Sequence, residues 1–133
     1  MPALRGLSRN MPFGCDWFRM EVMKPSTNIL IAGVGGQGVV SLTKALLKYC
    51  ELENKQTRSS IFKGGDQTLG TVHSLIRIFD SNCSDHSFYS NSVVPGDVDF
   101  LIGLEPWETL RFVSWTHRET QFLVNERRLS LWI

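Results

Sequence analysis

The chain has 133 residues, 42% of them hydrophobic, and a formal net charge of +1. That length accommodates one domain with a core of its own, and the small, scattered charge predicts no nucleic-acid-binding surface. Three widely separated cysteines (Cys15, Cys50 and Cys83) favour a reducing, cytoplasmic location, and their spacing argues against a zinc or iron–sulfur site held by this chain alone. The apolar runs are too short to span a membrane.

Residues 1–27 are expected to form an N-terminal extension, disordered rather than folded. Prolines and a glycine interrupt any periodicity, and no continuous apolar stretch of a secretory signal is present. The segment contains arginines but little serine, so a transit peptide is a weaker alternative. Met20 and Met23 leave open where the native chain starts.

The following domain, expected over residues 28–126, opens with an apolar strand at 28–34 and a helix from Gly36 to about Glu53. Further strands are predicted at 56–62, 71–79, 98–104 and 121–124, a helix at 105–113, and loops at 63–67 and 80–91. Strands that alternate with helices predict an α/β, Rossmann-like, three-layer domain with a mostly parallel sheet.

Residues 127–133 are expected to form an irregular tail after the last strand. A doubly wound domain that stops on a strand leaves part of one sheet face uncovered. We therefore expect either that the domain is truncated at its C-terminus or that a partner covers this face.

A glycine cluster joins the first strand to the first helix, with the order Gly33, Gly35, Gly36, Gln37 and Gly38. A glycine-rich turn between a strand and a helix is the context in which such a motif binds phosphate. The first glycine would allow the turn, the second a close backbone approach, and the last close packing of the helix. The alternative is a tight turn whose glycines serve packing only.

A dinucleotide site also needs an acidic residue at the tip of the second strand, which holds the ribose hydroxyls. Here that strand ends at Lys63, and Asp66 follows only after two glycines. The sequence thus argues against a complete nucleotide site, although a free-standing NAD(P)- or FAD-binding Rossmann domain stays as the alternative function.

The remaining candidates give no catalytic constellation and no metal site. The three histidines (His73, His86 and His117) are isolated in the sequence, and Cys50 is expected to be an inert thiol near a helix C-terminus. Glu105 and Glu108 lie at a predicted helix start, either as a carboxylate pair at the edge of the sheet or, as we favour, as complements of the helix dipole.

Two blocks of the sequence together resemble the gamma subunit, or gamma domain, of thiamine-diphosphate-dependent 2-oxoacid:ferredoxin oxidoreductases. Residues 29–39 (Ile-Leu-Ile-Ala-Gly-Val-Gly-Gly-Gln-Gly-Val) are similar to the family's opening strand and loop. Residues 96–111 are similar to its G-x-x-D strand followed by E-P-x-E-x-L-R. Residues 74–78 and 122–125 fit the strands between and after them, so the resemblance covers about residues 28–125.

The resemblance implies a subunit that supports oxidative decarboxylation of a 2-oxoacid such as pyruvate, ketoisovalerate or indolepyruvate. It implies that thiamine diphosphate and iron–sulfur clusters are held by alpha, beta and ferredoxin-like subunits, with ferredoxin as acceptor. This chain, which lacks a Gly-Asp-Gly…Asn-Asn run, would hold none of these cofactors. Its glycine loop would face a partner's cofactor site, and Glu105, Glu108 and Arg111 would face a partner.

The sequence departs from the family in one loop and at its C-terminal end. Family members often carry an S-x-R-G-G-like loop before the middle strand, whereas this chain has Thr68 and Leu69 where an arginine and a glycine would stand. The family's C-terminal portion is not recognisable after Asn125. The 2-oxoacid, and whether coenzyme A is used, therefore stay open.

Overall fold

The computed structural model describes residues 26–64, 70–79 and 92–126. The expectations for residues 1–25, 65–69, 80–91 and 127–133 therefore lie outside the described residues, and so do Cys15, Cys83, His86 and the departures at Thr68 and Leu69. None of the helices in the described part of the chain is long and apolar enough to cross a membrane.

Five strands form one sheet in the order β2-β3-β1-β4-β5. The strands are β1 (Ser26–Val34), β2 (Thr57–Lys63), β3 (Thr71–Phe79), β4 (Val98–Gly103) and β5 (Thr116–Val124). The helices are α2 (Val39–Leu52) and α3 (Pro106–Arg111), and α3 continues into a 3₁₀ turn at Val113–Trp115. The expected α/β fold is confirmed.

The sheet is mixed because β3 runs antiparallel to both of its neighbours, β1 and β2. The other pairs, β1–β4 and β4–β5, are parallel, so four of the five described strands point the same way. The connection from β2 to β3 is too short for a crossover helix, and a short connection joins antiparallel strands. This hairpin places β3 between β1 and β2, an order that strand patterning does not predict.

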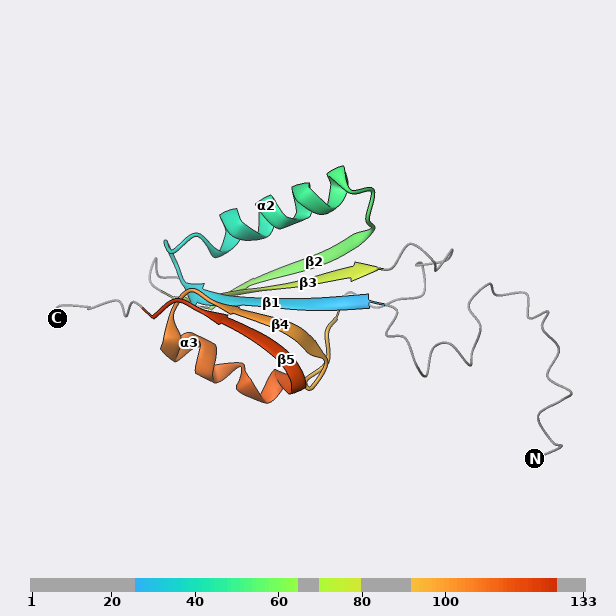
Figure 1. The fold of residues 1–133 in the computed structure, drawn as a ribbon. Coiled ribbons are helices and arrows are strands. Elements are labelled where there is room, and N and C mark those ends of the chain that lie inside the picture. Colours follow the sequence, from blue (N-terminus) through green and yellow to red (C-terminus); the bar gives the residue numbers. More distant parts are fainter. Residues whose placement is uncertain (1–25, 65–69, 80–91, 127–133) are drawn as a thin grey trace, which may run out of the picture.

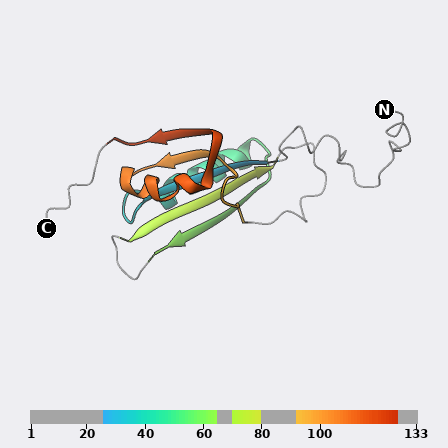
Figure 2. The ribbon, with the colours of Figure 1, turned by 90° about the horizontal axis from the view of Figure 1, so that it is seen from below.

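The two helices cover opposite faces of the sheet and make a three-layer arrangement (Figures 1 and 2). Alternate residues of β1 contribute to the hydrophobic cores on the two faces of the sheet, because successive side chains of a strand point to opposite faces. Ile31 packs with Val39, Val72 and Ile76 on the side of α2. The core on the α3 side contains Leu30, Ala32, Leu75, Val93, Val98, Leu101 and Phe112.

β5 is the strand that the described elements cover least. Its apolar residues Phe122, Leu123 and Val124 are 52%, 68% and 38% exposed, and neither helix makes substantial contact with β5. Within the described residues, these apolar side chains of β5 are therefore largely accessible.

The last strand begins five residues earlier than expected, at Thr116 rather than Gln121. Its register with β4 shifts between Val98 and Phe100, so its first half forms a bulge. In that bulge the Thr120 hydroxyl donates to the Val98 carbonyl at 2.6 Å and accepts the His117 amide at 2.8 Å. Residues 116–120 are polar and lack the alternation of apolar residues from which a strand is predicted.

Candidate functional site

The glycine loop lies at the carboxyl end of β1, where ligands bind in open α/β sheets. A Cβ atom at Gly33 would lie 2.9 Å from Val39 Cγ2 and 3.2 Å from Leu104 Cβ, so only glycine lets α2 approach this closely. Gly36 and Gly38 have φ values of 89° and 94°, a backbone conformation that residues other than glycine rarely adopt. The loop is therefore the tight strand-to-helix turn that its sequence predicts.

The Gln37 side chain, in contrast, makes contacts inside the chain. Its Oε1 accepts the Val34 amide at 2.8 Å, and its Nε2 donates to the Leu104 carbonyl at 3.4 Å. The amide of Gly35 donates to the Gly70 carbonyl at 2.9 Å. The loop thus bonds to the ends of neighbouring strands, and sequence reasoning gave no sign of the internal role of Gln37.

A cleft of about 410 Å³ opens beside this loop. Its lining includes Gly35, Gly36, Gly38, Lys63 and the first turn of α2. That helix begins without a side-chain cap and without an acidic residue in its first turn, which leaves its N-terminal N–H groups open to an anion. The described lining residues include no carboxylate that could hold a ribose, and β3 separates the tip of β2 from β1.

Glu105 is built into the start of α3. It is 5% exposed and is the N-cap residue, whose Oε2 accepts the Glu108 amide at 2.8 Å. The Thr109 hydroxyl donates to the Glu105 carbonyl at 2.7 Å. This agrees with the structural alternative for Glu105, a residue that stabilises the helix N-terminus, and leaves little of its side chain on the surface.

The other two residues expected to face a partner differ in exposure. The Glu108 side chain is 15% exposed and the Arg111 side chain 65%, with 3.4 Å between Arg111 Nη1 and Glu108 Oε1. Two large apolar side chains of α3, Trp107 and Leu110, are also exposed, at 61% and 60%. The outer surface of α3 is therefore mainly apolar, which the family motif by itself does not reveal.

His73 lies between two aromatic rings on the α3 side of the sheet. Its ring is stacked on Phe62 at 4.8 Å between centroids and tilted against Phe112 at 4.7 Å. Burial lowers the pKa of His73 from its usual value of 6.5, and the Glu108 carboxylate opposes part of this shift. The expectation that His73 is a structural residue fits this packing.

The His73 stack predicts a pH dependence of stability. Because the folded state disfavours the charged imidazole, it binds fewer protons than the unfolded chain, so this contribution is intact above about pH 6.5 and is lost as the pH falls below it. A His73→Phe variant should therefore lose less stability than the wild type between pH 7.5 and 5.5. Urea unfolding at the two pH values measures this, and equal losses in both proteins would contradict it.

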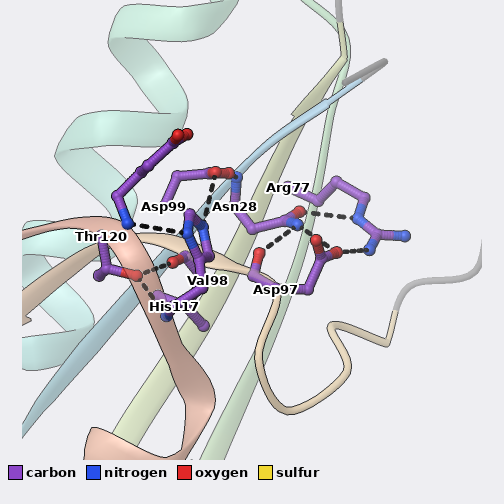
Figure 3. A network of polar contacts seen from close by, with 8 residues as sticks. Asn28, Arg77, Asp97, Val98, Asp99, His117 and Thr120 are labelled. Atoms are coloured by element: carbon purple, nitrogen blue, oxygen red, sulfur yellow. Dashed lines mark hydrogen bonds and ion pairs between the residues drawn. The ribbon is translucent and has the colours of Figure 1, made fainter. Parts of the chain in front are cut away.

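A polar network lies at the opposite, amino end of the parallel strands (Figure 3). Asn28 is fully buried; its Nδ2 donates to the carbonyl and to Oδ2 of Asp97, both at 2.8 Å, and its Oδ1 accepts Arg77 Nε at 2.9 Å. The backbone N–H of Asn28 donates to Asp99 Oδ2 at 2.7 Å, and Asp99 Oδ1 lies 3.4 Å from His117 Nε2. The network connects β1, β3, β4 and β5.

This network is satisfied internally, which indicates a structural role. Among the residues that the structure describes, no group of three or more His, Cys, Asp or Glu side chains could hold a metal ion. The sequence analysis did not identify the network, because the partners of Asn28 lie 49 to 71 positions away in the chain.

Comparison with known proteins gives consistent matches. A family model described as pyruvate ferredoxin/flavodoxin oxidoreductase matches residues 28–130. The indolepyruvate oxidoreductase subunit IorB of Archaeoglobus fulgidus is 27% identical over 103 residues, which make up 77% of this chain and 47% of that protein. IorB of Pyrococcus horikoshii is 30% identical over 101 residues, 75% of this chain and 46% of that protein.

Solved structures share the fold. A pyruvate oxidoreductase subunit PORC from Thermotoga maritima matches with a TM-score of 0.58 and 21% identity, over 77% of this chain and 51% of that chain. A 2-oxoglutarate:ferredoxin oxidoreductase from Magnetococcus marinus, solved with 2-oxoglutarate, coenzyme A and succinyl-CoA, matches with a TM-score of 0.64 and 15% identity, over 79% of this chain and 17% of that chain.

The chain spans about half the length of the curated relatives it matches. The family model covers the whole region from the glycine loop through β5, including the block that begins α3. The chain therefore belongs to the pyruvate ferredoxin/flavodoxin oxidoreductase family.

Proposed function

We propose that this chain is a gamma-type subunit of a 2-oxoacid:ferredoxin oxidoreductase, acting on pyruvate, ketoisovalerate or indolepyruvate. Thiamine diphosphate, which supplies the decarboxylation chemistry when bound, and the iron–sulfur clusters would belong to the partner subunits. The observation that carries the proposal is the family match over a glycine loop whose contacts serve packing. The names of the relatives, which are oxidoreductase subunits, support it.

In this role the chain presents its glycine loop and α3 to the partner subunits and carries out no bond-making step. Its glycine loop, followed by the uncapped start of α2, would lie toward a cofactor held by the partner. The exposed side chains of α3 would contact the partner directly. Ferredoxin would accept the electrons from the iron–sulfur subunit, and the chain would work in the cytoplasm.

Affinity capture of the full chain from the cells that encode it tests this proposal. The expected eluate contains a thiamine-diphosphate subunit and an iron–sulfur subunit, identified by mass spectrometry, and reduces a viologen dye when a 2-oxoacid is added. Recovery of a lone chain without either subunit would contradict the proposal.

A matched pair of substitutions identifies the docking surface. Leu110 on α3 and Leu52 at the end of α2 are 60% and 70% exposed, so a glutamate at either position should be tolerated by the fold. Leu110→Glu is expected to abolish capture of the partner subunits and Leu52→Glu to preserve it. Equal capture by both variants would place the interface elsewhere.

The cleft beside the glycine loop is the observation that favours the alternative, a free-standing NAD(P)- or FAD-binding domain. A ligand at 100 times its Kd stabilises a protein by about 2.7 kcal/mol, which a melting curve detects readily. We expect NAD, NADP and FAD to leave the melting temperature of the chain unchanged. A clear increase with any of them would favour the alternative.

A further inference from the structure

The Gln37 side chain lies between the glycine loop and the carboxyl end of β4. It accepts the Val34 amide at 2.8 Å and donates to the Leu104 carbonyl at 3.4 Å. The same carbonyl also accepts Asn125 Nδ2 at 3.4 Å, just after β5. One side chain thus connects the loop after β1 to the segment where β4 and β5 end.

The backbone at Gly33 lies close to both the Gln37 side chain and Leu104. A Cβ atom at Gly33 would lie 3.0 Å from Gln37 Oε1 and 3.2 Å from Leu104 Cβ, both closer than ordinary contacts. The next residue after Leu104 is Glu105, the N-cap of α3. The glycine loop and the start of α3 therefore pack against each other through Gln37.

We propose that Gln37 is a positioning residue, which fixes the distance between the glycine loop and the start of α3 so that a partner meets both as one surface. The partner rests on the proposed function, whereas the contacts belong to this chain alone. The residue that the family motif offers as a cofactor contact here acts through the loop backbone and through Leu104.

Two substitutions separate the two contacts of the amide. Gln37→Met keeps the length of the side chain and removes both hydrogen bonds. Gln37→Glu keeps an acceptor for the Val34 amide and replaces the donor to Leu104 with a carboxylate oxygen, which the carbonyl repels. Both changes leave the glycines and their backbone conformations in place.

Hydrogen exchange of the full chain measures the Val34 amide. We expect it to exchange about 10-fold faster in the Met variant, since this partly buried amide loses its acceptor, and at nearly the wild-type rate in the Glu variant. The amide of Ile76, in the core of β3, serves as the internal reference and should not change. Unchanged protection of Val34 in the Met variant, or equal loss at Val34 and Ile76, would overturn the proposal.

Partner binding supplies the readout that a purely structural role would not change. The Glu variant should keep Val34 protected and yet bind the captured thiamine-diphosphate subunit about 10-fold more weakly, because it lacks the donor to Leu104. Wild-type binding by this variant would overturn the positioning role. If the wild type captures no such subunit, the proposed function fails, and the exchange rates still decide whether Gln37 fixes the loop.

Discussion

Replacing Gly103 with alanine is expected to lower the free energy of unfolding by about 3 kcal/mol, the upper range for overpacking a core. Gly103 is the last residue of β4 and is buried beneath α3. A Cβ atom there would overlap Thr109 Oγ1 and lie 2.8 Å from Thr109 Cβ and Cγ2. Thr109 has little room to move, because it is 4% exposed and its hydroxyl donates to the Glu105 carbonyl.

Urea unfolding of two further variants shows whether crowding is the cause. Adding Thr109→Ala to Gly103→Ala should recover part of the lost stability, since it removes two of the three crowded atoms. Gly36→Ala is the control for backbone strain: it has φ of 89° and nothing within 4 Å of a Cβ atom, so it should cost about 1 kcal/mol. A loss below 1 kcal/mol for Gly103→Ala, or no recovery with Thr109→Ala, would refute the packing argument.

The elements that sequence patterns predict well here are those with strong local signals. The apolar run of β1, the glycine turn and the amphipathic α2 were predicted within a few residues of their bounds. The strand Thr71–Phe79 was also predicted, but not its antiparallel place between β1 and β2. Alternation identifies a strand and its faces, whereas its neighbours depend on contacts that are distant in the chain.

Only the local features of the candidate site could be predicted from the sequence. The turn at Gly33 and the favoured role of Glu105 at the start of α3 follow from local backbone chemistry, and both are seen. The inward position of Gln37 depends on Leu104, which lies 67 positions away. The network around Asn28 likewise joins four strands, so it becomes recognisable only when the sheet order is known.

The Asn28→Asp variant is expected to lose about 3 kcal/mol at pH 7, because a buried hydrogen-bonded pair loses its donor and gains a like charge. The new carboxylate would replace the Nδ2 group that now lies 2.8 Å from Asp97 Oδ2. The positive charge of Arg77 offsets part of the repulsion. Arg77 already contacts both side chains, with its Nε 2.9 Å from Asn28 Oδ1 and its Nη2 3.6 Å from Asp97 Oδ2.

The loss should depend on pH in a defined direction. Burial and the nearby Asp97 raise the pKa of the introduced carboxyl above its unfolded value of about 3.9, so the folded state binds more protons than the unfolded chain. The destabilisation is therefore full at neutral pH and shrinks as the pH falls toward about 4. Asn28→Leu is the control without an added charge: it also removes the Nδ2 hydrogen bonds to Asp97, and it removes the acceptor of Arg77 Nε as well. The difference in unfolding free energy between the two variants, measured at pH 7 and pH 4.5, cancels much of the titration of the native carboxylates. A difference that stays constant with pH would mean that the polar network around Asn28 tolerates a buried charge at position 28, and would contradict this prediction.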